Sequence, residues 1–110
     1  MTEYEMFIKR GKKNPEGPYI HDYGSLDEVR KASAHAVLMY RKHGTRAYVS
    51  IYNAKGAPLG VVAADRQGNP RWIPTSDVDI WGYSTVSSYK SIDPETGELT
   101  NPSKFNVRKG

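Results

Sequence analysis

Cysteine is absent from this chain of 110 residues. Its absence excludes a disulfide bond, a thiolate metal site and a cysteine nucleophile. The first ten residues carry two acidic side chains and no apolar run, so we expect no secretory signal there. Apolar stretches of the length that a membrane span needs are also lacking. From these absences we expect a cytoplasmic protein that makes no contact with a membrane.

Aliphatic side chains are scarce, close to the level at which a chain can remain disordered. Eight tyrosines and two tryptophans supply apolar surface that the aliphatic residues do not, and the net charge of +4 is too small to oppose collapse. The positive excess lies within residues 1–55, whereas the charges of residues 56–110 balance. We expect one folded domain over residues 1–100, followed by a polar tail over residues 101–110.

The clearest element is a helix, predicted over residues 26–43. Ser25 followed by Glu28 forms a capping box, and Gly44 stands where a helix commonly ends in a left-handed residue. At about 100° for each residue, one arc of the helix gathers mainly apolar side chains, which we expect to face the core. These are Leu26, Val29, Ala32, Ser33, Ala36, Val37, Met39 and Tyr40.

The opposite side of this helix carries a basic stripe. It consists of Arg30, Lys31, Arg41 and Lys42. A charged stripe of this kind is usually the solvent-facing side of an amphipathic helix, and this is the interpretation we favour. The alternative is a surface for an acidic partner, either a protein or a nucleic acid. Because the stripe faces away from the sheet, we expect that one ligand would not easily touch both.

Alternating side chains predict strands before and after the helix. Residues 4–10 alternate as a strand, whereas residues 11–18 are rich in glycine, proline and lysine and are predicted to form a solvated loop. After the helix, three predicted strands are joined by turns that begin with Asn or Asp and end with Gly, a common connection in antiparallel hairpins. These strands are residues 45–52, 58–65 and 71–75.

A last hairpin is predicted near the C-terminus, where Asp93-Pro94-Glu95-Thr96-Gly97 has the composition of a turn. The order is then strand, helix, three strands and a hairpin, which predicts an α+β fold with one helix packed on a mainly antiparallel sheet. A strand–helix–strand start favours a right-handed crossover. We therefore expect the strands on either side of the helix to run parallel, as neighbours or with one strand between them.

The stretch RAYVSIY, residues 46–52, has two different faces because successive side chains of a strand point to opposite sides. Ala47, Val49 and Ile51 suit the core. On the other face, the predicted sheet displays aromatic and basic side chains, with Val62 as a further candidate. The residues of this candidate binding face are Phe7, Lys9, Arg46, Tyr48 and Tyr52.

The aromatic and basic face allows three interpretations. We favour the one in which the C-terminal third, with Trp81, Tyr83 and Val86, covers the face within the same chain; pairing with a second copy is its alternative. An exposed face would suit single-stranded nucleic acid, because bases stack on the rings while Arg and Lys follow the phosphates. In the third interpretation, cross-strand aromatic pairs only stabilise the sheet.

Motifs for catalysis, metal binding or nucleotide binding are weak. His21 beside Asp22 has no nucleophile motif to accompany it, and the spacing of the three histidines matches no usual zinc pattern. Asp77 and Asp79 lie on one side of an extended segment, but a polar strand edge is the commoner meaning of that pattern. Glycine-rich phosphate-binding motifs are absent from the sequence. We therefore expect no enzymatic activity, no cofactor and no metal.

These observations favour a small non-enzymatic binding module with an accessory or regulatory role through contact with another protein, a second copy of the chain included. A nucleic-acid-binding protein that uses the aromatic and basic face is the alternative, and a small enzyme without a recognisable motif comes third. The net charge of only +4 favours the protein partner, because proteins that bind phosphate backbones usually carry denser positive charge.

Overall fold

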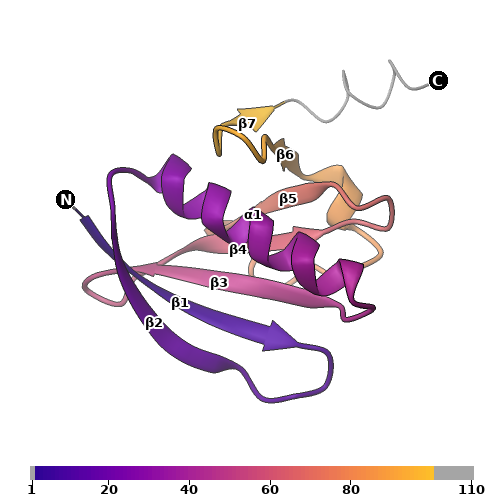
Figure 1. Ribbon diagram of the computed structural model, residues 1–110, viewed down its shortest axis with the longest axis horizontal. Coiled ribbons are helices and arrows are strands. Elements are labelled where there is room, and N and C mark those ends of the chain that lie inside the picture. Colours follow the sequence, from indigo (N-terminus) through magenta and orange to yellow (C-terminus); the bar gives the residue numbers. More distant parts are fainter. Residues whose placement is uncertain (1, 101–110) are drawn as a thin grey trace.

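The computed structural model describes residues 2–100, so the polar tail predicted for residues 101–110 lies outside the described residues. Helix α1 (Leu26–Lys42) packs on one side of a seven-stranded antiparallel sheet with the order β2-β1-β3-β4-β5-β6-β7 (Figure 1). The strands are β1 (Thr2–Arg10), β2 (Glu16–Tyr23), β3 (Ala47–Asn53), β4 (Pro58–Ala64), β5 (Pro70–Pro74), β6 (Lys90–Ile92) and β7 (Leu99–Thr100). This architecture confirms the predicted α+β class with its C-terminal strands.

Helix α1 begins and ends close to where the sequence predicts. The Ser25 hydroxyl accepts the backbone N–H of Glu28 at 3.3 Å, and the Glu28 carboxylate accepts the N–H of Gly24 at 2.8 Å. These bonds satisfy N–H groups that have no partner within the helix. Gly44 has a φ of +80°, which lets the chain leave the helix. Among residues 2–100, no helix has both the length and the apolar character that a membrane crossing requires.

The buried side of α1 is turned relative to the predicted arc. Met39, expected in the core, is 50% exposed, whereas Ala34, outside the predicted arc, is fully buried. The guanidinium of Arg30 lies 4.3 Å from the centre of the Trp72 ring, and its side chain is only 14% exposed. Packing on this large ring turns the Arg30 side of the helix toward the sheet. The predicted arc is right from its middle to its Val37 edge, where Val29, Ser33 and Val37 are buried.

Strand β2 is an element that the sequence analysis does not predict. The solvated loop expected over residues 11–18 is wrong from Glu16 onward, because residues 16–23 pair antiparallel with β1. Strand β2 lies at the edge of the sheet. Proline is tolerated in an edge strand because one side of such a strand makes no ladder hydrogen bonds. Glycine and Pro18 in this segment therefore do not exclude a strand.

The expected crossover geometry applies to a different pair of strands. β1 and β3 are antiparallel neighbours, so the prediction that the first strand runs parallel to the strand after the helix is wrong. The strand that directly precedes α1 is β2. Because β2 and β3 both pair antiparallel with β1, they run parallel to each other with one strand between them. This is the arrangement expected for strands joined through a helix.

The helix face of the sheet, the side that α1 covers, holds the larger core. Val49 and Ile51 are buried there together with Trp72, which confirms the predicted alternation along residues 46–52. Val62 pairs with Val49 and also faces the helix, so its expected place on the opposite face is wrong. Burial of such side chains stabilises the fold by roughly 25 cal/mol for each Å² of apolar surface removed from water.

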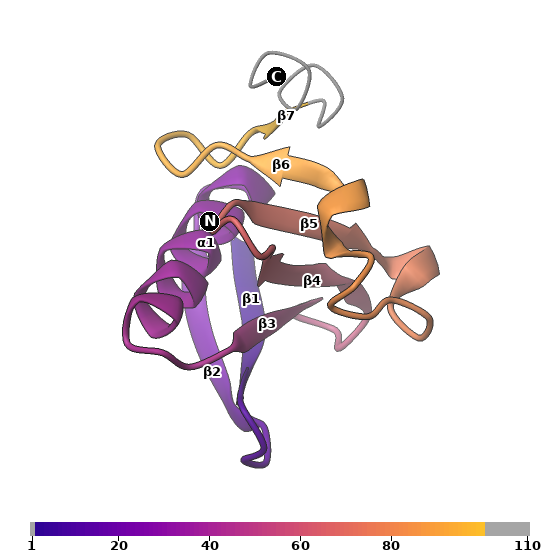
Figure 2. The ribbon, with the colours of Figure 1, turned by 90° about the vertical axis from the view of Figure 1, so that its right-hand side faces the viewer.

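The rear face, on the side of the sheet away from α1, is covered over part of its area. Residues 75–89 cross it (Figure 2) and contain the short 3-10 helices η1 (Thr75–Asp77) and η2 (Val86–Ser88). Val86 is fully buried in this second cluster. The sheet residues beneath it are Val61, Ala63 and Ile73. The prediction that the C-terminal third covers this face within the same chain is thus correct for one part of the face.

The C-terminal hairpin extends the sheet at its edge and does not lie on a face. β6 pairs with β5, and β7 pairs with β6. The turn between them also reaches α1, where the Nε2 atom of His35 lies 2.7 Å from the carbonyl oxygen of Pro94. The hairpin therefore docks on its own chain, through strand pairing and through a contact with the helix.

A buried ion pair joins the β4–β5 hairpin to the segment that follows. Arg71 donates hydrogen bonds to the Asp65 carboxylate at 2.8 and 3.0 Å, to the Ser91 hydroxyl at 2.8 Å and to the Tyr89 carbonyl at 3.1 Å. Burial opposes ionisation of Asp65, but hydrogen bonds from Asn69 and Arg71 outweigh it and hold the pKa of this carboxyl below its usual range. Each charge is thus satisfied by the other, which a buried charge requires.

Candidate functional site

Four of the five residues predicted for the sheet site line one hollow on the rear face. The hollow has a volume of about 310 Å³ and lies beyond the area that residues 75–89 cross. Its lining residues are Phe7, Lys9, Pro15, Tyr48, Ser50 and Tyr52. Arg46, the fifth predicted residue, lines a different depression. The predicted face is therefore divided between two neighbouring sites.

Two strands build the hollow from side chains of unequal size. Tyr48, Ser50 and Tyr52 lie on the same side of β3, and Phe7 of β1 stands directly opposite Ser50. Because Ser50 is small, a gap remains between the larger side chains around it. The rings of Phe7 and Tyr52 meet edge to face with their centres 5.6 Å apart. This contact orients both rings within the protein itself.

Tyr48 marks the boundary between the open and covered parts of the rear face. The ring of Trp81 meets Tyr48 edge to face at 5.1 Å, and Tyr83 meets Trp81 at 5.3 Å. The Arg46 guanidinium in turn lies 4.3 Å from the centre of the Tyr83 ring. Burial of its hydroxyl raises the pKa of Tyr83 to about 12. A row of aromatic contacts thus leads from the hollow to Arg46.

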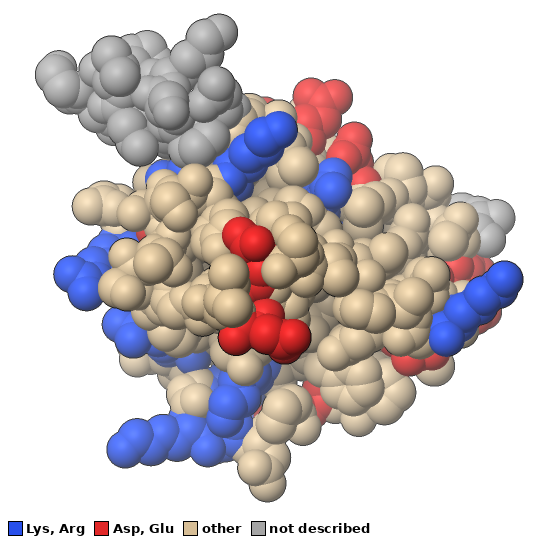
Figure 3. All heavy atoms as spheres, turned by 180° about the vertical axis from the view of Figure 1, so that it is seen from behind, with Lys and Arg blue, Asp and Glu red and all other residues tan. Residues whose placement is uncertain are grey.

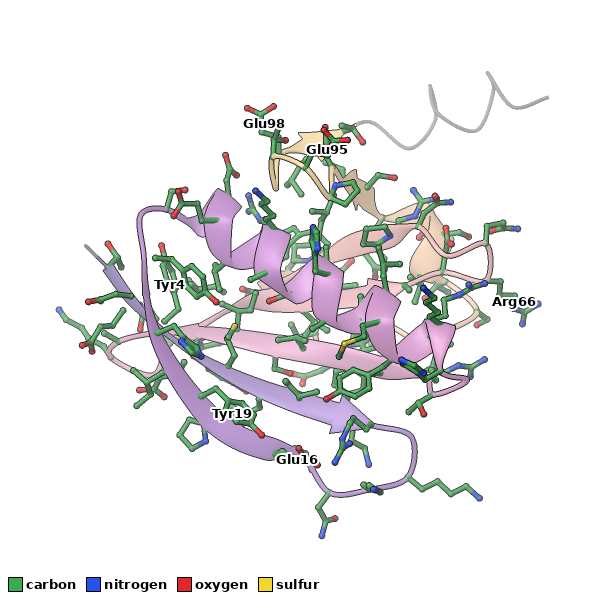
Figure 4. All side chains as sticks on the ribbon, viewed as in Figure 1. Tyr4, Glu16, Tyr19, Arg66, Glu95 and Glu98 are labelled. Carbon is green, nitrogen blue, oxygen red and sulfur yellow. The ribbon has the colours of Figure 1, made fainter. Side chains whose placement is uncertain are left out.

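The second depression is a groove of about 430 Å³ where three arginines from separate elements meet. Arg41 comes from the last turn of α1, Arg46 precedes β3, and Arg66 lies in the turn between β4 and β5. Figure 4 shows Arg66 projecting beside the C-terminal end of the helix. The expectation that one ligand could not easily touch both the helix stripe and the sheet site does not hold, since Arg41 and Arg46 line one groove.

Contacts within the protein hold two of these arginines in place. Arg41 donates a hydrogen bond to the backbone carbonyl of Arg66 at 2.5 Å, which ties the helix end to the β4–β5 turn. Arg46 is held by its stacking on Tyr83. A guanidinium has five N–H donors, and these contacts leave donors on both side chains for a ligand. The groove therefore presents positioned cations whose ordering does not depend on binding.

The positive charge of the groove is not balanced by a lining carboxylate. Asp65 is the one acidic residue among the described residues that line it. Its Oδ1 accepts the backbone N–H groups of Gln67 and Asn69, and its Oδ2 accepts two N–H groups of the buried Arg71. The charge of Asp65 is thus neutralised by the buried Arg71, and the three arginines of the groove are exposed.

The negative end of the helix dipole also lies near this groove and would oppose an anion. Its carbonyl groups are largely paired within the chain. The carbonyls of Met39, Tyr40 and Arg41 accept backbone N–H groups of residues 43–45, the segment that leads from the helix toward β3. Each of the three arginines carries a full positive charge, which is larger than the partial negative charge of about half a unit at the end of a helix.

Positive charge continues from the groove into the β1–β2 loop. The N–H of Gly11 donates to the carbonyl of Arg46 at 2.7 Å, which places this loop beside the start of β3. Lys12 and Lys13 of the loop are exposed. Figure 3 shows most of its Lys and Arg side chains on the left and lower side of the view, with acidic side chains at the middle, the top and the right. We call the following set the basic edge: Lys12, Lys13, Arg41, Arg46 and Arg66.

The predicted basic stripe of α1 does not form one surface. Arg30 covers Trp72 and pairs with Asp27 at 3.1 Å, so it serves the helix–sheet interface. Arg41 belongs to the groove. The remaining members, Lys31 and Lys42, are exposed. Only part of the stripe therefore matches the expected solvent-facing side of the helix.

Several residues of the site lie outside the sequence-based prediction, namely Lys12, Lys13, Pro15, Ser50 and Arg66. Ser50 stands between Tyr48 and Tyr52 in RAYVSIY, and a small residue between two large ones on one strand face is a local signal for a gap. Arg66 has no such signal, because its turn looks like any exposed hairpin turn in the sequence. Its importance comes from the contact with Arg41, 25 residues away in the chain.

Groups suited to acid–base or metal chemistry are dispersed over the molecule. His21 is exposed on β2 with its ring near Tyr23, and His35 contacts the C-terminal turn. Within residues 2–100, no group of three or more His, Cys, Asp or Glu side chains is placed to hold a metal ion. The arrangement instead offers cations and rings for binding. Comparisons with protein-family models, with curated proteins and with solved structures find no match to this chain.

Proposed function

We propose that this protein is a non-enzymatic binding module for nucleic acid, with an accessory or regulatory role, and that its basic edge holds the phosphate backbone. The observation that carries the proposal is the groove where Arg41, Arg46 and Arg66 meet, with its one described lining carboxylate already committed to buried partners. Lys12 and Lys13 extend the charge beyond the groove. Such a row of cations suits an extended polyanion better than a single small anion.

Arginine suits this task because of its geometry. The planar guanidinium presents parallel N–H donors that match two oxygens of a phosphate. Since Arg41 and Arg46 are already held by Arg66 and Tyr83, less side-chain entropy is lost when they bind. Binding of a polyanion also releases condensed counterions, which makes the affinity depend steeply on salt.

The distribution of charge favours a nucleic-acid partner, although the low net charge of the whole chain favours a protein partner. A net charge of +4 is modest when spread over the whole surface. Three of the five cations of the basic edge, however, line one groove, and the loop that carries the other two is hydrogen-bonded to the Arg46 backbone. A polyanion responds to the local field and not to the net charge.

The test is a salt titration of binding to a fluorescent single-stranded oligothymidylate, followed by anisotropy between about 50 and 200 mM salt. We expect the logarithm of the association constant to fall linearly with the logarithm of the salt concentration. The variant that combines Arg41→Gln with Arg66→Gln should bind more weakly. Its slope should be less steep by about 0.7 for each phosphate that the variant no longer neutralises.

A matched control removes the same charge elsewhere. Lys31→Gln with Lys55→Gln alters two exposed lysines, one on the outer side of α1 and one in the turn after β3, away from the groove. This control should keep both the affinity and the slope close to those of the wild type. Absence of binding at low salt, or equal losses in the two double variants, would reject the basic edge as a nucleic-acid site.

Protein contact is the second candidate function, and the free edge of the sheet favours it. Strand β2 is an outer strand with Tyr19 41% exposed and Ile20 56% exposed. An exposed edge can pair with a strand of another protein or of a second copy. For the second copy, sedimentation should show a concentration-dependent mass that Ile20→Lys abolishes. A wild type that stays monomeric at every concentration would exclude self-association through this edge.

A further inference from the structure

We infer that the hollow between Tyr48 and Tyr52 receives an unstacked base, so that the protein selects single-stranded over double-stranded nucleic acid. This inference rests on the proposed function, since it assigns the base to the hollow and the backbone to the basic edge. Duplex bases are stacked and paired and cannot enter a hollow without being extruded. The bases of a single strand are available to stack on aromatic side chains.

The small volume and the mainly aromatic lining of the hollow suit one flat ring. Its floor is Ser50 with Phe7 opposite, and Tyr48 and Tyr52 stand at its two ends. Its volume of about 310 Å³ lies at the lower limit of ordinary small-ligand pockets, which start at about 300 Å³. Apart from Lys9, Ser50 and the tyrosine hydroxyls, the rings and Pro15 present apolar surface. We therefore expect stacking with little preference for one base.

The rings around the hollow are positioned by other parts of the protein. Trp81 supports Tyr48 from the covered side, and Phe7 supports Tyr52. Both pairs meet nearly at right angles, with interplanar angles of 90° and 85° respectively. A base that enters therefore meets walls that are already oriented, which lowers the entropy lost on binding.

The hollow and the basic edge lie close enough for one strand to use both. Arg46 and Tyr48 are two positions apart on the same side of the chain, and Tyr83 and Trp81 connect them through ring contacts. At the other wall, Lys9 lines the hollow and its ammonium donates to the carbonyl of Lys13. Since Lys9 pairs with Tyr48, cations of the edge and of the β1–β2 loop thus lie together at the Tyr48 end of the hollow, where a backbone that inserts one base can pass.

The opposite end of the hollow, beside Tyr52, is electrostatically unfavourable for a phosphate chain. Glu5 pairs with Tyr52 across β1 and β3 and lies on the same side of the sheet. Its carboxylate would repel a phosphate that continued past Tyr52. The backbone should therefore pass along the Lys9 and Arg46 side of the hollow, and only the base should reach toward Tyr52.

The decisive variant is Ser50→Leu, which fills the hollow but removes no ring and no charge. The probes are the fluorescent oligothymidylate strand, the same strand annealed to its complement, and an abasic strand of equal length. We expect the wild type to bind the normal strand more tightly than the duplex or the abasic strand. Ser50→Leu should lose roughly 5- to 150-fold in affinity for the normal strand, the range of one base–aromatic stack, and little for the other two probes.

Ser50→Ala is the matched control, because it keeps the hollow and removes only the hydroxyl; it should bind like the wild type. Thermal melting establishes that each variant is folded, and Tyr52→Ala replaces Ser50→Leu if that protein does not fold. The abasic strand also tests the inference on the wild type alone. Equal binding of normal, abasic and duplex probes would overturn the inference and leave the proposed function standing. Failure of every probe to bind at low salt would instead overturn the proposed function.

Discussion

The covered and open halves of the rear face belong to one sheet but present different side chains. Under residues 75–89, strands β4 and β5 present Val61, Ala63 and Ile73, which form a dry cluster with Val86. Beyond that segment, β1 and β3 present half-buried rings and a lysine around Ser50. Small aliphatic side chains suit complete burial, whereas tyrosine keeps a polar end that can remain in water. The side chains therefore distinguish the part of the face that is core from the part that stays open to solvent.

The covered half also needs a polar anchor that the open half does not. A loop laid over a sheet brings backbone carbonyls with it, and buried carbonyls must find donors. Arg71 supplies such a donor to Tyr89 and is itself neutralised by Asp65. The helix on the other side pairs its backbone groups internally. This contrast explains why the ion pair lies on the rear side of the sheet.

Removing the segment that covers part of the rear face should have the largest effect on the stability of the fold. Truncation after Thr75 deletes Val86, the β6 strand and two of the groups that Arg71 binds. We expect a protein that is unfolded or less stable by more than about 4–5 kcal/mol, beyond the usual range of single substitutions. Circular dichroism and urea denaturation measure the loss. Truncation after Thr100 is the control. If the protein that ends at Thr75 unfolds at the same urea concentration as this control, the prediction is wrong.

Breaking the buried ion pair of Arg71 and Asp65 should have the next largest effect on the free energy of unfolding. Arg71→Ala leaves the Asp65 carboxylate buried without its cation, which should cost about 3–5 kcal/mol of unfolding free energy. The double variant Arg71→Met with Asp65→Asn removes both charges and should recover much of that loss. Chemical denaturation of the single and double variants measures the coupling. A cost below about 1 kcal/mol for Arg71→Ala would show that this pair behaves like a surface ion pair.

Low pH should weaken the same ion pair, because Asp65 then takes up a proton. The pKa of Asp65 in the folded protein lies below its ordinary value of 3.8, so the unfolded chain takes up the proton first as the pH falls. The stability that Asp65 contributes is fully present above that ordinary value and is lost as the pH falls through the folded pKa. Urea midpoints below about pH 4 should fall more steeply for the wild type than for the Arg71→Met, Asp65→Asn variant. Parallel curves would contradict this assignment.

Trp81 tests the boundary between the two halves. Trp81→Ala should cost about 2 kcal/mol, less than the about 3–5 kcal/mol of a fully buried tryptophan, because the side chain is only half-buried. It should also free the Tyr48 ring and enlarge the hollow, because the edge-to-face support at 5.1 Å is removed. Denaturation measures the first effect, and binding of a hydrophobic dye measures the second. A variant with unchanged stability and no added dye binding would show that Tyr48 does not depend on the cover.

The smallest effect is expected on the helix side of the sheet. Ser25→Ala removes the hydroxyl that accepts the Glu28 N–H and should cost about 1 kcal/mol, within the usual range of about 0.5–2 kcal/mol for a cap. Because Ser25 and Trp81 share no partner, the two losses should add to within about 0.5 kcal/mol. Strong non-additivity in urea denaturation would mean that the two sides of the sheet do not stabilise the fold independently.

Local patterns made much of the fold predictable. The cap at Ser25, the glycine that ends α1 and the alternation of RAYVSIY each depend on residues within a few positions of one another. The hollow on the rear face could be predicted in part for the same reason, because its tyrosines lie on one side of one strand. Strand β2 could not be predicted, since its proline and glycine are tolerated only because it lies at an edge.

The sequence by itself determined the helix with its caps, the hairpin turns and which side chains of β3 share a face, because these features follow from backbone geometry over short distances. Only the tertiary structure decided which way α1 turns, since that depends on Arg30 meeting Trp72 across the helix–sheet interface. It likewise decided which part of the rear face is covered, and that Arg41, Arg46 and Arg66 line one groove. These outcomes depend on contacts between residues far apart in the chain, which local patterns do not encode.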